Sequence, residues 1–267
     1  MKKINPNELN EKSLSCVYND EKILTKEENY EMAIKKDKEQ YGHLYDLPDI
    51  KERLIILDIE VTGNNKGDFN LFELSAFKMR EGKITGKFFH SFFIPKDLPM
   101  AEKFIKRHKI PQSVKFLTPE DDKKKLKIFL DFLKDSTIIS HNALYDMDII
   151  NKGLKNYEFD TIKETQFKCS ERILLNLYPK KFYKFTSLQE CLDQFEIEYD
   201  KENFHLAIFD SYYLAKIIEN IYRKKLEEEN TNLTNSQVKE VYFLFKEEEE
   251  KNNEFIGKKR KEKSIKY

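Results

Sequence analysis

The sequence predicts a mixed α/β domain of about 170 residues, with a central sheet flanked by helices. Two observations predict this fold class. Three strand-like runs come first and follow one another as a meander that begins near residue 53. Short apolar strands then alternate with amphipathic helices as far as residue 223, as in sheets whose strands are joined by helical crossovers. We therefore expect an extension over 1–50, a domain over 51–223 and a charged tail over 224–267.

The composition supports an ordinary core with polar ends. Of the 267 residues, 39% are hydrophobic and 36% are charged, and the formal net charge is zero. The chain as a whole is therefore not attracted to nucleic acid, and any anionic partner must be held by a local patch or by bound metal. Cys16, Cys169 and Cys191 form no CxxC pair, which argues against a disulfide framework and a structural zinc site.

The location of the protein is predicted from what the sequence lacks. The beginning of the chain does not resemble a signal peptide, and no uncharged apolar run approaches the length of a transmembrane helix. Together with the cysteine usage, these features predict a cytoplasmic protein that has no membrane partner.

The individual elements follow from periodicity and punctuation. Alternating apolar residues predict strands over 53–60, 69–79 and 86–94, with a hairpin-like turn over 80–86. Helical spacing predicts the other main elements. These are a weak helix over 26–42, helices over 119–135, 142–154, 186–195 and 206–222, and a short strand over 136–140.

Two carboxylates stand at the end of the first predicted strand, in the stretch LIILDIEVTG. Side chains alternate along a strand, so Asp58 and Glu60 point the same way as Leu54 and Ile56. Two like charges on a half-buried face lose hydration and repel each other, which costs several kcal/mol unless a cation compensates. A divalent metal ion or a cluster of Lys and Arg would each serve.

Two further acids lie on apolar faces of predicted helices. Asp146 and Asp210 share their helical stripes with aliphatic residues at spacings of three, four, seven and eight. No Lys or Arg lies on these stripes, so surface ion pairs explain all four acids poorly. Oxygen ligands without His or Cys partners suit Mg²⁺ or Mn²⁺ rather than zinc, and Mg²⁺ readily shares its coordination shell with phosphate oxygens. The pattern thus predicts phosphoryl-transfer chemistry.

His205 is the candidate proton acceptor. It precedes Asp210 by five residues and is expected in the loop that enters the last helix, where it can point at the metal site. A neutral imidazole there could accept a proton from an attacking water near physiological pH. The alternative interpretation is an ordinary solvent-exposed loop histidine.

These residues together resemble the DEDDh (DnaQ-like) family of 3′–5′ exonucleases, which contains the DNA polymerase III epsilon subunit, RNase T and oligoribonuclease. The resemblance covers roughly 53–222. DIEVTG resembles the first motif, HNALYD the second and HLAIFD the third. The related DEDDy class has Tyr four residues before the last acid, whereas this chain has Leu206 there, so it is more similar to the histidine class.

The resemblance implies an RNase H-like fold and two metal ions. Asp58, Glu60, Asp146 and Asp210 would hold the ions, and His205 would be the general base. Thr62 and Gly63 match positions near the 3′ end of the substrate, Asn142 belongs to the second motif, and His108 lies where some relatives stack on a terminal base.

Three positions depart from the family pattern, although none of them removes a catalytic group. These are Val61, Asn64 and Tyr145. Outside the motifs, the loop YPKKFYKF interleaves lysines with aromatics and makes Lys181 a candidate contact for a single strand. An equally good interpretation is that the aromatics of this loop cap the core.

The expected activity is a metal-dependent 3′–5′ exonuclease acting on single-stranded nucleic acid. DNA proofreading or repair is the first expectation, and the terminal extensions would tether the enzyme to a polymerase or another protein. An exoribonuclease is the runner-up. A different class, a non-catalytic module that binds nucleic acid or a partner protein, fits less well because binding alone needs no general base.

Overall fold

The computed structural model describes residues 25–63, 69–183 and 186–229. The chain divides into two compact units, Met1–Gln40 and Tyr41–Tyr267. Helix α1 (Lys26–Tyr41) provides the described structure of the first unit and buries none of its side chains, in keeping with its weak apolar pattern. Cys16 and Asn64 lie outside the described residues.

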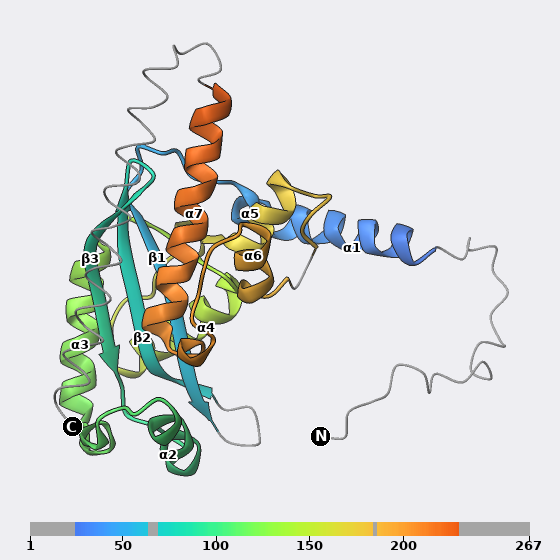
Figure 1. Cartoon of the computed structure of the whole chain (residues 1–267). Helices are drawn as coiled ribbons and strands as arrows, with labels where there is room; N and C mark the ends of the chain where they lie inside the picture. The colour runs from blue at the N-terminus through green and yellow to red at the C-terminus, as the bar shows by residue number, and fades with distance from the viewer. Residues whose placement is uncertain (1–24, 64–68, 184–185, 230–267) are drawn as a thin grey trace, which may run out of the picture. The chain divides into compact units, whose positions relative to one another are not determined.

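A five-stranded mixed sheet forms the centre of the second unit, in the order β3-β2-β1-β4-β5 (Figure 1). The antiparallel meander consists of β1 (Leu54–Gly63), β2 (Phe69–Arg80) and β3 (Lys83–Phe92). Two short parallel strands, β4 (Thr137–Ser140) and β5 (Phe167–Cys169), extend it beyond β1. The predicted mixed α/β class is therefore confirmed.

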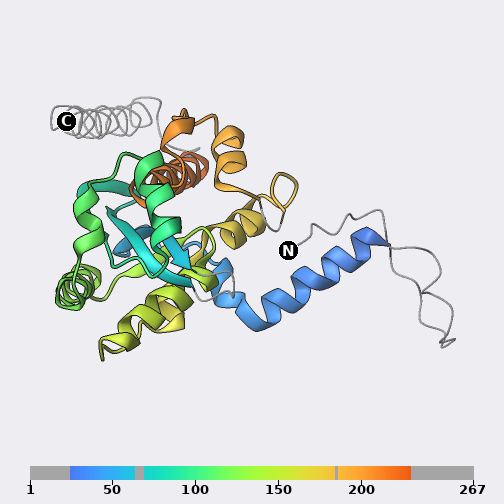
Figure 2. The same ribbon diagram turned by 90° about the horizontal axis from the view of Figure 1, so that it is seen from below.

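Helices cover both faces of this sheet (Figures 1 and 2). Alternation along β1 directs Leu54 and Ile56 into a core with α7 (Ala207–Glu229), and Ile55 and Leu57 into a core with α3 and α4. The remaining helices are α2 (Leu98–Arg107), α3 (Pro119–Leu133), α4 (Ala143–Asn156), α5 (Ser170–Leu177) and α6 (Leu188–Gln194). None of the described helices is both long enough and apolar enough to span a bilayer.

The expected turn over 80–86 is corrected by the structure. The turn between β2 and β3 occupies only Glu81 and Gly82, since β3 begins at Lys83. Gly82 adopts φ 73°, and a side chain there would come within 2.9 Å of the Tyr222 Cβ, so this tight turn needs glycine.

Packed structure continues on both sides of the expected domain, 51–223. Leu44 is fully buried in the core beside α3 and α4, so the compact unit begins at Tyr41. At the other end, α7 continues to Glu229. Helices α2 and α5 and strand β5 were not predicted, because each is short and has little periodicity of its own.

Candidate active site

Asp58 and Glu60 lie in the middle of β1, on the face that α7 covers. Asp58 pairs with Ser75 of β2, and Glu60 pairs with Glu73. The register shifts directly after Glu60, and such a bulge redirects the side chains that flank it. Both acids are half-buried.

Asp146 and Asp210 lie in the first turns of α4 and α7, and their exposed fractions are only 6% and 8%. The amino end of a helix favours a negative charge, which lowers the cost of burying them. One oxygen of Asp210 accepts a hydrogen bond from the His205 backbone N–H at 3.1 Å. The other, Oδ1, is buried and finds no hydrogen-bond partner among the described residues.

A hydrogen bond between two serines fixes α7 against the sheet beside these acids. The Ser211 and Ser75 hydroxyl oxygens are 2.8 Å apart, and both side chains are fully buried. Ser211 follows Asp210, and Ser75 is the cross-strand partner of Asp58. The contact therefore holds together the elements that carry the first and the last acid.

Burial and neighbouring carboxylates raise the pKa values of all four acids. Burial raises the pKa of Asp58 well above its usual range, and the charges of Asp210, Asp146, Glu60 and Glu73 raise it further. Burial is also the main cause that raises the pKa of Glu60 to about 8 and the pKa values of Asp146 and Asp210 to about 7. The site thus concentrates negative charge where water screens it poorly.

His205 reaches this cluster from the loop before α7. Its backbone is left-handed, with φ 64°, and its side chain is exposed. One ring nitrogen and carboxylate oxygens of Glu60 and Asp210 all lie within 4.8 Å of one another. The structure thus brings His205 together with acids from β1 and α7.

Three further residues belong to this region and were not predicted. Glu73 is fully buried, and its Oε1 lies 2.7 Å from His90 Nε2, while its Oε2 has no described hydrogen-bond partner. Arg107, at the end of α2, is the cation that lowers the pKa of Glu60 against the effects of burial and of Glu73. Only strand register and the position of α2 bring these residues to the site, and neither can be read from the sequence.

The expected substrate contacts are distributed unevenly. Thr62 and Gly63 are buried at the end of β1, and Thr62 Oγ1 has no hydrogen-bond partner in the described ranges. Asn142 is exposed immediately before α4. His108 follows α2, and burial, then Arg107, lowers the pKa of its imidazole.

A cavity of about 490 Å³ lies beside His108. It is lined by Arg107, His108, Lys109, Lys201, Glu202, Asn203 and Leu206. Leu206 directly follows His205, so the cavity adjoins the histidine loop. Its three cations make it suitable for an anionic group next to the acids.

Lys181 is not brought into the cluster. It lies on the exposed turn after α5, and no described contact joins it to the four acids. Beside it, Phe182 is buried and stacks on Phe195, and Tyr178 packs edge-on against Phe195. The interpretation that these aromatics cap the core is therefore confirmed for Tyr178 and Phe182, while Lys184 and Phe185 lie outside the described residues.

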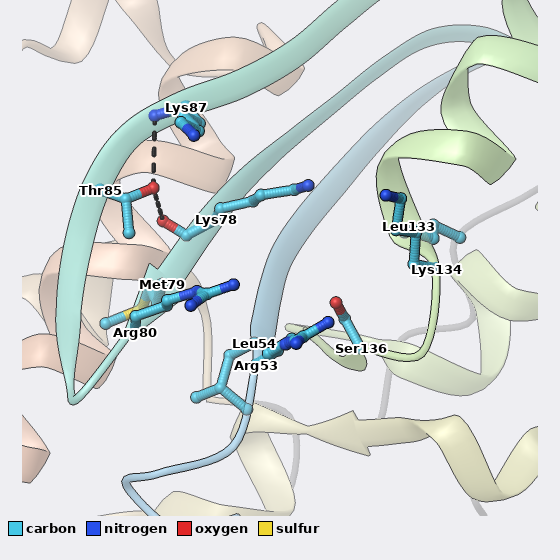
Figure 3. Close-up of a pocket in the computed structure, with 10 residues that line it drawn as sticks. All are labelled: Arg53, Leu54, Lys78, Met79, Arg80, Thr85, Lys87, Leu133, Lys134 and Ser136. Carbon is cyan, nitrogen blue, oxygen red and sulfur yellow. Dashed lines mark hydrogen bonds between the residues drawn. The ribbon is translucent and has the colours of Figure 1, made fainter.

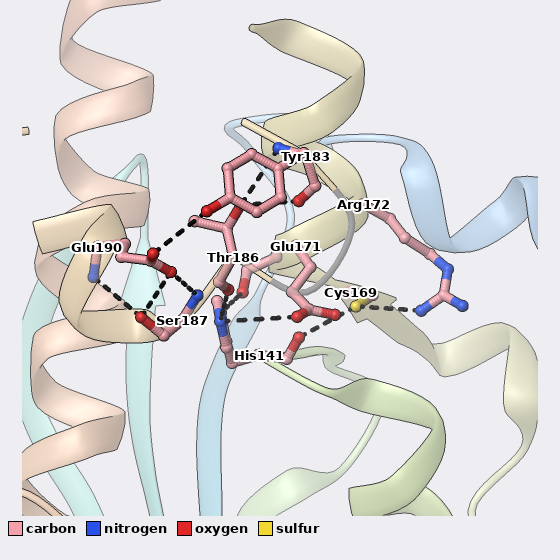
Figure 4. A network of polar contacts seen from close by, with 9 residues as sticks. His141, Cys169, Glu171, Arg172, Tyr183, Thr186, Ser187 and Glu190 are labelled. Atoms are coloured by element: carbon pink, nitrogen blue, oxygen red, sulfur yellow. Dashed lines mark hydrogen bonds and ion pairs between the residues drawn. The ribbon is translucent and has the colours of Figure 1, made fainter. Parts of the chain in front are cut away.

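His141, from the second motif, has a structural environment of its own (Figure 4). Its Nε2 lies 2.8 Å from the Thr186 carbonyl oxygen and must donate, so its Nδ1 accepts the Ser170 hydroxyl at 2.9 Å. Burial lowers the pKa of the ring, in agreement with this neutral form. The histidine thus links the end of β4 to α5 and to the segment before α6.

No described Lys or Arg compensates the four acids through an ion pair. Within the described ranges, no Lys or Arg lies within ion-pair distance of any of the four acids. The unpartnered Asp210 oxygen and the raised pKa values fit a divalent cation, and a donor set of carboxylates suits Mg²⁺ or Mn²⁺. The residues present therefore fit the metal that the sequence predicts.

The mixed sheet, with acids from β1, α4 and α7 converging beside a histidine, defines a nuclease domain of the RNase H-like class. The family model of the RNase T type, described as an exonuclease, matches residues 55–218. The chain belongs to this exonuclease family, and it is a 3′–5′ exonuclease of the DEDDh (DnaQ-like) group.

Similar proteins include subunits of bacterial replicases. The chain is 31% identical to the DNA polymerase III subunit epsilon of Buchnera aphidicola subsp. Baizongia pistaciae, over 62% of this chain and 69% of that protein. It is 32% identical to the same subunit of Rickettsia prowazekii, over 62% of this chain and 72% of that protein.

Among solved structures, the nuclease domain of a DEDDh 3′-exonuclease bound to rAMP has a similar fold. Its TM-score is 0.53 at 16% identity, covering 67% of this chain and 95% of that domain. A full-length 3′-exonuclease gives the same TM-score over 66% of this chain and 83% of that protein. At this identity the likeness establishes the fold alone.

Proposed function

We propose that the protein removes nucleotides from the 3′ end of single-stranded DNA in a reaction that needs divalent metal ions. The observation that supports this most strongly is the position of Asp58, whose pKa is raised by four other carboxylates as well as by burial. A chain gains nothing in stability from such a cluster, whereas a cation-dependent phosphodiesterase requires it.

Asp58, Glu60, Asp146 and Asp210 would hold two Mg²⁺ or Mn²⁺ ions. Bound ions of this kind stabilise the negative charge that builds up on the phosphate oxygens during hydrolysis. The protein's part is to fix the carboxylates in advance. The Ser211–Ser75 contact and the His205 N–H hydrogen bond to Asp210 do so from both sides of the last acid.

His205 would accept the proton of the attacking water. The water oxygen forms a bond to the terminal phosphorus, and the bond from phosphorus to the 3′ oxygen of the preceding nucleotide breaks. A 5′-mononucleotide leaves, and the shortened strand takes up a proton at its new 3′ hydroxyl. The exposed position of His205 beside Glu60 and Asp210 suits a base that must reach solvent and substrate together.

The terminal nucleotide would lie between the end of β1 and the cavity beside His108. Thr62 and Gly63 end β1 and His108 lines the cavity, so these residues and Asn142 would border the nucleotide, and Arg107 and Lys201 would supply cations for the strand's phosphates. Tyr145 is exposed at 39%, and after burial the charges of Asp146 and Glu60 raise its pKa, so its ring lies near the acids and offers a stacking face.

DNA is proposed as the substrate because the relatives named above are subunits of DNA polymerases. The same relationship makes a polymerase subunit the expected protein partner. The chain is also 28% identical, over 66% of its length, to a part of the PolC-type DNA polymerase III of Bacillus cereus. RNA is the competing substrate, since the structural neighbour was solved with rAMP.

The test is degradation of matched 5′-labelled DNA and RNA oligomers with Mg²⁺, Mn²⁺ or EDTA. A ladder that shortens from the 3′ end of DNA, absent with EDTA and in Asp146→Asn, is expected. Asp148→Asn is the matched control, because Asp148 is exposed two residues further along α4. Faster cleavage of RNA would reverse the substrate assignment, and intact strands under every metal condition would refute the proposed metal-dependent activity.

A further inference from the structure

A second charged cavity lies far from the acids, at the end of the sheet where β1 begins (Figure 3). Its volume is about 380 Å³. Its basic lining residues are Arg53, Lys78, Arg80, Lys87 and Lys134. In Figure 3, Lys78 extends from β2 across the opening towards the end of α3, where Lys134 stands.

The positive charge of this basic pocket is not compensated within the described part of the chain. None of its five cations forms an ion pair with a described carboxylate. Burial lowers the pKa of the Lys78 amine, and the charges of Lys134, Lys87, Arg80 and Arg53 lower it further. Repulsion of this kind costs stability, and a bound anion would relieve it.

The basic pocket does not continue the proposed substrate path. The Lys78 amine lies over the Phe132 ring, on the side of the sheet that α3 covers, whereas Asp58 and Glu60 point to the same side of β1 as Leu54 and Ile56, towards α7. Glu60 also lies seven residues further along β1, about 23 Å at 3.3 Å per residue. A site that tracks a nucleic acid strand places its cations in a row along a groove. Here they surround one cavity.

The floor of the basic pocket is apolar and its rim is held in place. Leu133 lines the floor and is buried, whereas Leu54 and Met79 border the pocket but direct their side chains into the core beneath α7. The Lys78 amine lies 4.2 Å from the centre of the Phe132 ring, which orients it. The neighbouring Thr85 hydroxyl donates a hydrogen bond to the Lys78 carbonyl oxygen at 3.0 Å. Cations around an apolar floor suit a ligand that carries carboxylates and an apolar side chain together.

We propose that the basic pocket is a docking site for an acidic peptide segment of a partner protein, with an apolar side chain seated against Leu133. Because this pocket lies on the other face of the sheet from the acids, the partner can remain bound while a 3′ end occupies the active site. The inference is independent of the proposed metal chemistry.

The test is fluorescence anisotropy with the full chain and a labelled probe peptide, a run of aspartates ending in phenylalanine. The wild-type protein is expected to bind it in a salt-sensitive manner. Replacing the aspartates by asparagine, or the phenylalanine by glycine, should weaken binding. Lys87→Glu and Lys134→Glu should each weaken binding about tenfold. Their exonuclease activity on short single strands should match the wild type, which verifies folding.

The matched control is Lys123→Glu, which makes the same charge change on α3 about 16 Å from Lys134 along the helix axis. Binding that is absent in the wild type, or lost equally in Lys123→Glu, would overturn the proposal. The proposal would also be overturned if the peptide did not bind and a labelled DNA strand, measured in EDTA, bound the wild type but bound Lys134→Glu more weakly. A variant in which glutamine replaces Glu247–Glu250 should bind the peptide with unchanged affinity. Tighter binding by this variant would overturn the proposal, because it would identify the chain's own acidic run as the occupant.

Discussion

Glu60 of β1 and Glu73 of β2 face each other directly as a cross-strand pair. Like charges at such positions destabilise a sheet. Here Glu73 is fully buried and contacts His90, and after burial its charge is the next largest cause that raises the pKa of Glu60 to about 8. In the absence of a cation, Glu60 is therefore largely protonated at neutral pH.

Removing the charge of Glu73 should shift the pH dependence of the nuclease. In Glu73→Gln the pKa of Glu60 should fall, so Glu60 ionises at a lower pH. The pH at which activity rises should therefore fall by about half a unit to one unit. Rates measured from pH 5.5 to 9 at fixed Mg²⁺ test this. Glu81→Gln, in the exposed β2–β3 turn, is the control and should leave the profile in place. Identical profiles for both variants would show that Glu73 does not act on Glu60.

The metal-free protein should lose stability as the pH rises. Carboxyl groups with raised folded-state pKa values stabilise the fold fully below their unfolded values, near 4, and lose that contribution as the pH passes their folded values. Those folded values are about 8 for Glu60 and about 7 for Asp146 and Asp210. In EDTA, the free energy of unfolding should therefore decrease from about pH 4 to pH 8.

Divalent cations should reverse this trend, because they bind the ionised carboxylates. Melting temperatures with Mg²⁺ or Mn²⁺ should exceed those in EDTA at pH 8, and the difference should nearly vanish at pH 5. A metal effect of equal size at both pH values would contradict the assignment of the cation site to these acids.

Replacing Asp58 should abolish activity and stabilise the metal-free fold. Asp58→Asn removes a central negative charge that four carboxylates oppose, so its melting temperature in EDTA at pH 8 should rise. Nuclease activity should drop by about 10³-fold or more, because the metal ligands act as a unit. Thermal unfolding and single-turnover cleavage measure the two effects. A variant that is less stable than the wild type under these conditions would show that the acids are not in mutual repulsion.

Replacing His205 should separate chemistry from metal binding. The backbone of His205 is left-handed, and after glycine Asn tolerates this conformation best, so His205→Asn should keep the N–H hydrogen bond to Asp210. The cleavage rate should fall about 10²–10⁴-fold while the metal affinity changes little. If metal affinity fell as steeply as the rate, His205 would be a ligand and not the base.

The sequence predicts the strands, the main helices and the acids because each depends on local periodicity. Asp58 and Asp210 stand out since they break an apolar pattern that extends on both sides of them. Glu73 also lies between apolar residues, but its partner Glu60 is defined only by the register of β1 and β2. Arg107 reaches the site through α2, which has too few turns to be recognised from its pattern.

Direct measurement of Mn²⁺ binding by electron paramagnetic resonance decides whether the buried acids form a cation site. Asp210→Asn should bind Mn²⁺ at least about tenfold more weakly than the wild-type protein, because it replaces the acid with the unpartnered buried oxygen. Asp148→Asn should bind like the wild type. Equal Mn²⁺ affinity in all three proteins would contradict a metal centre built from Asp58, Glu60, Asp146 and Asp210.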